Sequence, residues 1–242
     1  HGVAKPTGVA VSADGERVYV TQTGGARTTI LFDHQGRQQA VLAPPPESGK
    51  SHIPVYVAIN PVNQDVYVSD RLSGAVYVYT ANGTYRKTLK PEGLAGTFAP
   101  LGLGFGVDGT LYVSEVGGSP HRILVIDPAG KVTNEFKAAD LPMQFPNGIA
   151  AGAEGVTAVA DGNNGRLIFF DQTGRVVGQV NRGIGSGDLG LPRGVAVDGD
   201  GRYFVVDTTN HTVHVYRLAD PSTHKVDFVG SFGEEGIADG AF

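Results

Sequence analysis

Hydrophobic residues in this chain come in short runs of five or six positions, separated by glycine-rich turns. One such run begins with proline, continues with small and aliphatic residues, and recurs at intervals of 46 to 48 residues. The five prolines are Pro6, Pro54, Pro100, Pro146 and Pro192. Short apolar runs bounded by Gly, Asn and Asp are typical of strands, so the pattern predicts many short strands joined by tight turns.

Each proline run starts a unit with the same order of segments. In the second unit, the apolar segment 54–59 is followed by a turn, an alternating segment at 66–70, a loop, an apolar segment at 76–79 and a polar segment at 86–90. This order predicts a four-stranded antiparallel meander. The fourth segment is the most polar, which suits the outer edge of a sheet, where charge discourages pairing with another edge.

Five such meanders predict an all-β fold, a β-propeller of four-stranded antiparallel blades with five blades present. We expect a single propeller domain over residues 1–242, with repeats near 5–52, 53–98, 99–144, 145–190 and 191–242. Four glycines near the starts of the first strands are expected to face crowded backbone, where a side chain would clash. They are Gly8, Gly102, Gly148 and Gly194.

Composition and charge narrow the class of protein. The chain has 242 residues, 36 glycines, no cysteine and a formal net charge of −5. Without cysteine it has no disulfide, no thiolate zinc site and no cysteine nucleophile. No apolar stretch reaches the roughly 18 residues of a membrane-spanning helix, so we expect no membrane insertion in this segment. The negative charge argues against nucleic-acid binding, which needs a basic face.

The repeated phrases resemble a known family. Pro-x-Gly-Val-Ala-Val, as at residues 192–197, followed by Asp-Gly, Tyr-Val-x-Asp and Phe-Asp-x-x-Gly, resembles the NHL repeat, and the resemblance covers essentially the whole chain. NHL-like propellers usually have six blades, so the resemblance implies a six-bladed parent, with closure by five blades as the alternative. It also implies an extracytoplasmic location, periplasmic or at the cell surface, within a membrane-attached protein or complex.

In a propeller, the first strand of each blade begins and the second strand ends at the same face. Side chains there are expected to surround one mouth of the central channel, where loops on a rigid frame carry function. The residues that follow the repeat prolines are Thr7, Val55, Leu101, Asn147 and Arg193, and those that end the second strands are Gln22, Asp70, Glu115, Asp161 and Asp207. The candidate binding residues are Asn147, Arg193, Tyr56, Asp70, Glu115, Asp161 and Asp207, of which Tyr56 replaces the repeat glycine.

Four carboxylates on one rim are also a candidate site for a hard cation such as Ca²⁺, which takes about six to eight oxygen ligands. Arginines in the following loops favour another interpretation, in which Asp161 pairs with Arg166 and Glu115 pairs with Arg122 to fix the loops. The equivalent loop histidine of two repeats, at position 121 and again at 211, gives little support to a zinc site without a third ligand. We therefore predict no bound metal and no cofactor.

The segment 145–148, Phe-Pro-Asn-Gly, resembles the Asn-Gly segment of gluconolactonase-like and strictosidine-synthase-like propellers. In those lactonases the Asn helps to ligate a divalent metal together with acidic residues. The resemblance implies Asn147 and Asp207 as ligands of Ca²⁺ or Zn²⁺ in a metal-dependent lactonase or hydrolase, which is the alternative function. The acidic ligand near the N-terminus has no counterpart, since Thr7 and Gln22 stand there. A structural role of Asn147 in a turn is the competing interpretation.

The function that we expect is non-enzymatic, although the sequence leaves the enzymatic status open. The chain is predicted to be a recognition or scaffold module that presents its loop-bearing face to a protein, peptide or glycan. The guanidinium of Arg193 is suited to hold a carboxylate or another anion of a partner bidentately. RNA binding, as in animal NHL proteins, is disfavoured by the net charge and by the acidic rim.

Overall fold

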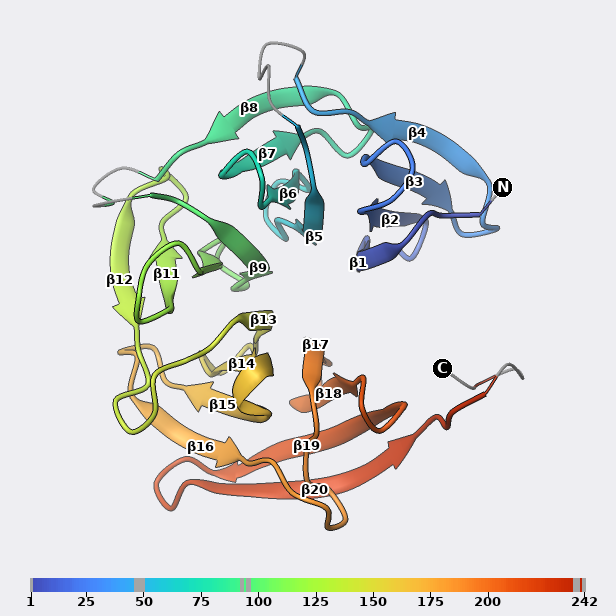
Figure 1. Ribbon diagram of the computed structural model, residues 1–242. Helices are drawn as coiled ribbons and strands as arrows, with labels where there is room; N and C mark the ends of the chain where they lie inside the picture. Colours follow the sequence, from blue (N-terminus) through green and yellow to red (C-terminus); the bar gives the residue numbers. More distant parts are fainter. Residues whose placement is uncertain (1, 46–50, 92–93, 95–96, 237–239, 241–242) are drawn as a thin grey trace. The chain divides into compact units, whose positions relative to one another are not determined.

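The computed structural model describes residues 2–45, 51–91, 94, 97–236 and 240. Within them the chain forms five four-stranded sheets, numbered blades 1 to 5 in chain order, in which consecutive strands are neighbours (Figure 1). The strands pair antiparallel, and the only helix among the described residues is a short 3₁₀ turn, η2 (Gly162–Asn164). The predicted all-β fold of four-stranded antiparallel propeller blades is confirmed.

The strand bounds follow the predicted repeats closely. Blade 1 contains β1 (Pro6–Val11), β2 (Arg17–Gln22), β3 (Thr29–Asp33) and β4 (Gln38–Leu42). Blade 2 contains β5 (Pro54–Ile59), β6 (Val66–Asp70), β7 (Ala75–Tyr79) and β8 (Tyr85–Leu89). Blade 3 contains β9 (Pro100–Phe105), β10 (Leu111–Glu115), β11 (Arg122–Ile126) and β12 (Val132–Phe136).

Blade 4 contains β13 (Pro146–Ala151), β14 (Thr157–Asp161), β15 (Arg166–Phe170) and β16 (Val176–Val180). Blade 5 contains β17 (Pro192–Val197), β18 (Arg202–Asp207), β19 (Thr212–Asp220) and β20 (Lys225–Phe232). Its last hairpin is long, with nine residues in β19 and eight in β20. Every repeat proline is the first residue of a first strand, as predicted.

The turns between strands are built by aspartate and glycine. In blade 5, the Asp198 carboxylate accepts hydrogen bonds from the backbone N–H groups of Asp200 (3.0 Å) and Arg202 (2.9 Å). Gly201 has a φ of 72°, a left-handed conformation that costs a side-chain-bearing residue about 1 kcal/mol or more. The Asp-x-x-Gly spacing therefore ends one strand and starts the next.

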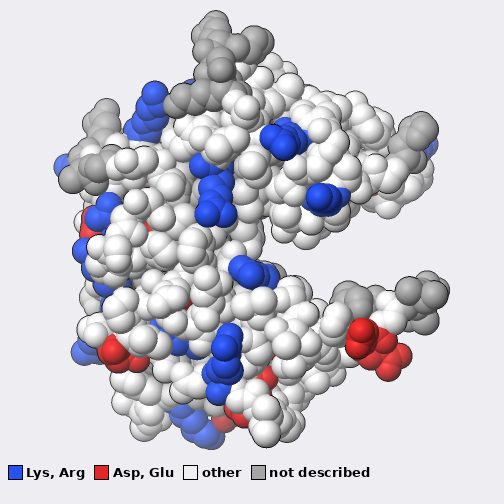
Figure 2. Space-filling model, in the orientation of Figure 1, with Lys and Arg blue, Asp and Glu red and all other residues white. Residues whose placement is uncertain are grey.

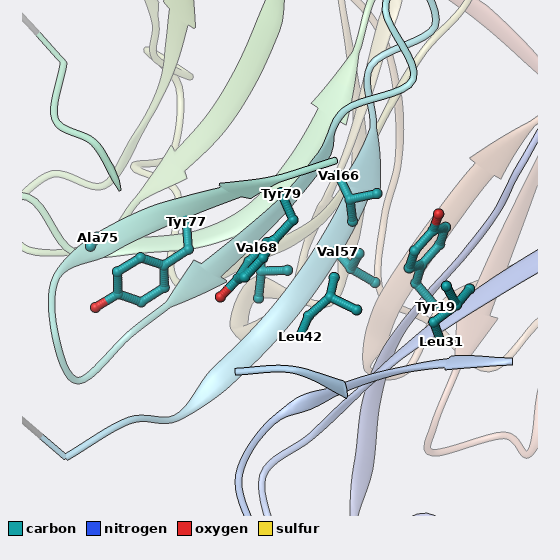
Figure 3. Packing of buried hydrophobic residues seen from close by; sticks show 9 residues of the cluster. All are labelled: Tyr19, Leu31, Leu42, Val57, Val66, Val68, Ala75, Tyr77 and Tyr79. Carbon is teal, nitrogen blue, oxygen red and sulfur yellow. The ribbon is translucent and has the colours of Figure 1, made fainter. Parts of the chain in front are cut away.

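The chain divides into two compact units. Unit 1 comprises residues 1–118 and 125–133, and unit 2 comprises residues 119–124 and 134–242. The core of unit 1 lies between the facing sides of blades 1 and 2, where Tyr19 of β2 and Val57 of β5 belong to one buried cluster (Figure 3). The Tyr19 hydroxyl donates to the Ala81 carbonyl at 2.6 Å, so the aromatic side chain also fixes the blade–blade distance.

Unit 2 has a core of the same kind between blades 4 and 5. Phe169 of β15 meets Tyr203 of β18 edge to face, with ring centroids 5.0 Å apart. In unit 1, Tyr67 of β6 and Phe105 of β9 also meet edge to face between blades 2 and 3, with ring centroids 4.9 Å apart. These four aromatic side chains are therefore packing residues between blades.

The predicted crowding at the repeat glycines is present at two of the three positions for which neighbours are known. A Cβ on Gly8 would lie 2.7 Å from the Val55 carbonyl oxygen, and one on Gly148 would lie 2.5 Å from the Val195 nitrogen. The prediction is wrong for Gly194, where a Cβ would meet only Val206, at 3.5 Å.

Candidate functional site

The residues that end the second strands are buried instead of lying on an open rim. We call them the latch residues: Gln22, Asp70, Glu115, Asp161 and Asp207, with 6%, 0%, 1%, 0% and 1% of their surface exposed. Carboxylates are almost never fully buried unless they are paired. Their partners therefore define what this part of each blade does.

In unit 1 the latch side chains hold the chain segment that leads into the first strand. Asp70 accepts a hydrogen bond from the Ile53 N–H (3.1 Å) and another from the Ser73 N–H (2.9 Å). The Nδ1 atom of His52 lies 3.1 Å from the same carboxylate. The carboxylate of Asp70 thus joins the incoming segment before β5 to the loop after β6.

Blades 1 and 3 use the same arrangement. The Gln22 side-chain carbonyl accepts from the Ala4 N–H at 3.1 Å. The Glu115 carboxylate accepts from the Gly117 N–H at 2.6 Å and from the Ala99 N–H at 3.4 Å. Gln22 performs the role of the acids without a charge, so the repeat position predicts this contact better than the charge does.

In unit 2, Asp161 accepts from one backbone amide and two side chains. Asp161 accepts from the Gln144 N–H (2.7 Å), the Asn164 side chain (2.8 Å) and the Arg166 Nε (2.8 Å). Asp161 and Arg166 have 0% and 3% of their side chains exposed, so the predicted ion pair is confirmed and is buried. Arg122 donates to Glu135 at 2.8 Å, and its predicted pairing with Glu115 stays a prediction.

Asp207 is held almost entirely by backbone. Its two oxygens accept from the N–H groups of Gly190 (2.6 Å), Leu191 (3.0 Å) and Thr209 (3.0 Å). Burial alone would raise the pKa of the Asp207 carboxyl, but these amides and that of Asn210 outweigh it, and the pKa is lowered. Asp207 is therefore an ionised structural anchor.

The acidic rim that the sequence suggested is not on the surface of the described chain. Asp70, Glu115, Asp161 and Asp207 turn into their own loops because a strand-end carboxylate finds several unpaired N–H groups within reach there. The argument against RNA binding loses this support and keeps only the net charge. A direct contact of these four carboxylates with a partner stays a prediction.

Asn147 also has an internal contact. It is 6% exposed, and its Nδ2 donates to the Phe145 carbonyl at 2.6 Å. Phe145 has a φ of 51°, and its N–H donates to His121 Nδ1 at 2.9 Å. The turn-stabilising interpretation of Asn147 is thus supported by its geometry, and His121 is a loop anchor that sequence analysis noted only as a possible metal ligand.

The alternative metal ligands Asn147 and Asp207 are given by the resemblance to the lactonases. Within the described ranges, no group of three or more His, Cys, Asp or Glu side chains is placed to hold a metal ion. Asn147 Oδ1 and the Asp207 carboxylate would supply the oxygen ligands of the lactonase alternative, and backbone N–H groups already engage both carboxylate oxygens of Asp207. In this arrangement Asp207 fits a divalent metal poorly.

Two candidate residues lie at the starts of first strands. Arg193, the second residue of β17, and Tyr56, the third residue of β5, are both half-buried. The Tyr56 N–H donates to the Ser69 hydroxyl at 3.1 Å. Ser69 in turn donates to the Leu101 carbonyl at 2.6 Å, which links blades 2 and 3 through one hydroxyl. Binding of a partner by Arg193 or Tyr56 stays a prediction.

The loops beside the latch residues of unit 1 carry exposed charges of one sign. In the described segments 2–5, 23–28, 51–53, 71–74, 97–99 and 116–118, the exposed charged residues are Lys5, Arg27 and Arg71, and no Asp or Glu is present. Lys5 and Arg27 have φ values of 52° and 51°, left-handed conformations that are uncommon outside glycine. Figure 2 shows Lys and Arg side chains over one face of the molecule, with few Asp or Glu among them.

The five four-stranded antiparallel blades define a β-propeller, and part of one blade matches a known repeat family. The family model of the NHL repeat matches residues 189–216, which include β17, β18 and the start of β19. The predicted resemblance to NHL-repeat propellers is therefore confirmed.

Among known proteins, the chain is 27% identical over 169 residues to the E3 ubiquitin-protein ligase TRIM56 of Homo sapiens, a match that covers 69% of this chain. It spans about a fifth of the length of that curated relative, 22%. Among solved structures, it is similar to virginiamycin B lyase from Staphylococcus aureus, with a TM-score of 0.67 and 18% identity over 94% of this chain and 70% of that one. A chain of a nidogen/laminin complex gives a TM-score of 0.74 with 18% identity, over 94% and 79%. At this identity the structural likeness establishes the fold alone.

None of the helical structure in the described residues is long and apolar enough to cross a membrane. This agrees with the absence of an 18-residue apolar stretch in the sequence.

Proposed function

We propose that this chain is a protein-interaction module whose cationic loops in unit 1 bind an acidic segment of a partner protein. The observation that carries the proposal is the separation of charge in these loops. The acids at the strand ends are buried in latches, whereas Lys5, Arg27 and Arg71 remain exposed.

The latches also make the loops suitable for recognition. The Lys5 carbonyl accepts from the Thr23 N–H at 3.0 Å, and the Ala4 N–H donates to Gln22 at 3.1 Å, so the segment carrying Lys5 is fixed at several points. A surface that is already ordered loses less conformational entropy when a partner binds. Left-handed φ values at both Lys5 and Arg27 add to this, since strained residues are often retained where their side chains have a role.

A protein partner is favoured over nucleic acid by the net charge of −5, which opposes a long polyanion approaching the rest of the surface. The similarity to a ubiquitin-protein ligase is in line with a role in protein association. A peptide partner fits the same surface, whereas a neutral glycan would not use its charge. The extracytoplasmic location is part of this proposal only through the family resemblance.

The metal-dependent lactonase alternative has less support. It requires the Asp207 carboxylate to release backbone hydrogen bonds, such as that from the Gly190 N–H at 2.6 Å, before it could ligate a cation. The similarity to virginiamycin B lyase is at 18% identity and does not transfer an activity.

The proposal is tested with a fluorescent ten-residue Glu/Asp-rich peptide and with single-stranded RNA of matched length, by fluorescence anisotropy at two salt concentrations. We expect the peptide to bind and Arg27→Glu to weaken it about tenfold, the effect of losing one charge-assisted contact worth about 1.4 kcal/mol. Lys87→Glu, an exposed cation on the outer strand β8, is the matched control and should change binding much less. Equal binding by both variants, or tighter binding of the RNA than of the peptide, would show the assignment to be wrong.

A further inference from the structure

Blade 1 has an apolar face on the side opposite to blade 2. The strand register pairs Val9 with Val20, Val18 with Phe32, and Ile30 with Val41, so these side chains share one face of the sheet. Val9, Val11 and Val41 on this face are 65%, 55% and 45% exposed. Contiguous exposed apolar side chains of this kind mark interaction sites on soluble proteins.

Blade 5 has a matching face on the side opposite to blade 4. The register pairs Phe204 with Val215, Val206 with Val213, and Val213 with Phe232. Phe232 is 54% exposed and Val206 is 42% exposed. The other face of blade 5, which includes Tyr203 and Val205, is buried in the core of unit 2.

The repeat shows what such faces pack against. Between blades 1 and 2, one blade contributes Tyr19, Leu31 and Leu42, and the next contributes Val57, Val66 and Val68, all within one buried cluster (Figure 3). The register places the open face of blade 5 in the role of the first set: Phe204, Val215 and Phe232 occupy the repeat positions of Tyr19, Leu31 and Leu42. The open face of blade 1 takes the second role: Val9, Val18 and Val20 occupy the positions of Val57, Val66 and Val68.

The difference in burial between these equivalent positions is large. Leu42 is 1% exposed, whereas Phe232 is 54% exposed. Val57 is 6% exposed, whereas Val9 is 65% exposed. Blade 1 and blade 5 therefore each carry a face of the blade–blade type with exposed apolar side chains.

We propose that a second copy of this chain covers them, with the blade 5 face of one copy packed on the blade 1 face of the next. Between blades 1 and 2 such a face packs against a sheet face of the next repeat, and another copy of the chain presents a sheet face of this kind. The two contacting surfaces differ, so the interface is heterologous and each added copy leaves one free face of each kind. The surface is separate from the cationic loops of the proposed function.

The test uses two variants, each with one face blocked. Val9→Asp blocks the blade 1 face, and Phe232→Asp blocks the blade 5 face; both positions are exposed, so the blades should fold. We expect the wild type to grow in mass with concentration in analytical ultracentrifugation, and each variant alone to stay monomeric. An equimolar mixture of the two variants should form a dimer of twice the monomer mass, through the two faces that remain intact.

Val62→Asp, at an exposed valine outside both faces, is the control and should associate like the wild type. A wild type that stays monomeric up to high concentration overturns the proposal. So does a mixture that stays monomeric while the wild type associates, because a two-faced interface requires the variants to complement each other. Variants that associate as well as the wild type also overturn it.

Cross-linking supplies a second measurement that does not depend on aspartate being tolerated. The chain has no cysteine, so Val9→Cys and Val206→Cys each introduce a single thiol. We expect a short bis-maleimide to join the two variants to each other far more than either to itself. In the double variant it should give cross-linked dimers and larger species. Cross-linking confined to single chains of the double variant would overturn the proposal.

Discussion

Asp161 in unit 2 and Asp70 in unit 1 occupy the same repeat position and are both fully buried, yet their charge is balanced differently. Asp161 pairs with the guanidinium of Arg166 at 2.8 Å. At the position equivalent to Arg166, blade 2 has Ala75, and Asp70 instead has His52 at 3.1 Å. Both accept a backbone N–H from the segment that leads into the first strand.

The comparison separates the contact that is common to all five blades from the contacts that differ between blades. The backbone hydrogen bond from the incoming segment recurs in all five latch residues, including the uncharged Gln22. The side chain beside the acid differs between blades, since blades 2 and 5 place a histidine there and blade 4 places the permanent charge of Arg166. The latch position therefore serves to fix loops, and the buried ion pair is a feature that blade 4 adds to it.

The largest effect is expected from removing this charge in unit 2. Arg166→Leu leaves Asp161 buried without its cation and also removes donors to Gln179 and to the Leu141 carbonyl. Breaking a buried pair in this way costs about 3–5 kcal/mol of unfolding free energy. Urea unfolding followed by circular dichroism measures the loss.

Two further variants test whether the loss comes from the buried charge. Arg175→Leu in the same blade removes an exposed pair with Asp171 and should cost no more than about 1 kcal/mol. Adding Asp161→Asn to Arg166→Leu should recover part of the loss, because no unpaired buried charge remains. If Arg166→Leu cost as little unfolding free energy as Arg175→Leu, the buried ion pair of blade 4 would contribute no more than an exposed one.

The sequence predicted the blades better than the latches. Proline starts and Asp-x-x-Gly turns act through local backbone geometry, so strand positions could be derived from residue order. The direction of a strand-end carboxylate depends on which N–H groups the loop leaves unpaired, and this is set only when the loop has folded. A signal was present after the acids, in Ser73, Asn164 and Asn210, since Asp followed three residues later by Ser or Asn favours a side-chain-stabilised turn.

The same dependence on the folded surroundings explains why the crowding predicted at Gly194 is absent. Its sequence context, Pro-x-Gly, is that of Gly148, but crowding depends on the strand packed against it and not on its own neighbours in the chain. Gly148 faces the backbone of β17, whereas Gly194 faces only Val206 among the described residues. The position of a residue in the repeat predicts its backbone conformation, but it cannot by itself predict which residues pack against it.

A smaller change in the free energy of unfolding is expected from alanine substitutions at Gly148 and Gly194. Gly148→Ala would place a Cβ 2.5 Å from the Val195 nitrogen and 2.8 Å from the Arg193 carbonyl oxygen, both backbone atoms that cannot move without shifting β17. Overpacking of this kind costs about 1–3 kcal/mol. Gly194→Ala is the matched variant and should be neutral or stabilising by up to about 1 kcal/mol, since alanine reduces the entropy of the unfolded chain. Thermal unfolding of both variants at the same pH compares them, and equal destabilisation would contradict the assigned surroundings.

The smallest effect concerns the histidine beside the latch of blade 5, which contrasts with His52 beside Asp70. His214 is 7% exposed, its Nε2 lies 3.8 Å from the Asp207 carboxylate, and its Nδ1 has no hydrogen-bond partner among the described residues. Burial lowers the pKa of His214 below the usual 6.5, and Asp207 offsets only part of this. The unfolded chain therefore takes up the proton at a higher pH than the folded chain does.

The lower pKa of His214 in the folded chain determines the sign of the pH dependence of stability. As the pH falls below about 6.5, protonation favours the unfolded chain, so stability decreases until the pKa of the folded state is passed. Asp207 acts in a separate, more acidic window, because its lowered pKa contributes stability that is lost only below its usual 3.8. His214→Gln should flatten the change in unfolding free energy between pH 7.5 and 5, measured by urea titration at each pH. Phe228→Leu, which alters packing against the same ring, should shift stability equally at both pH values; an unchanged slope in His214→Gln would mean that the buried histidine does not titrate in this range.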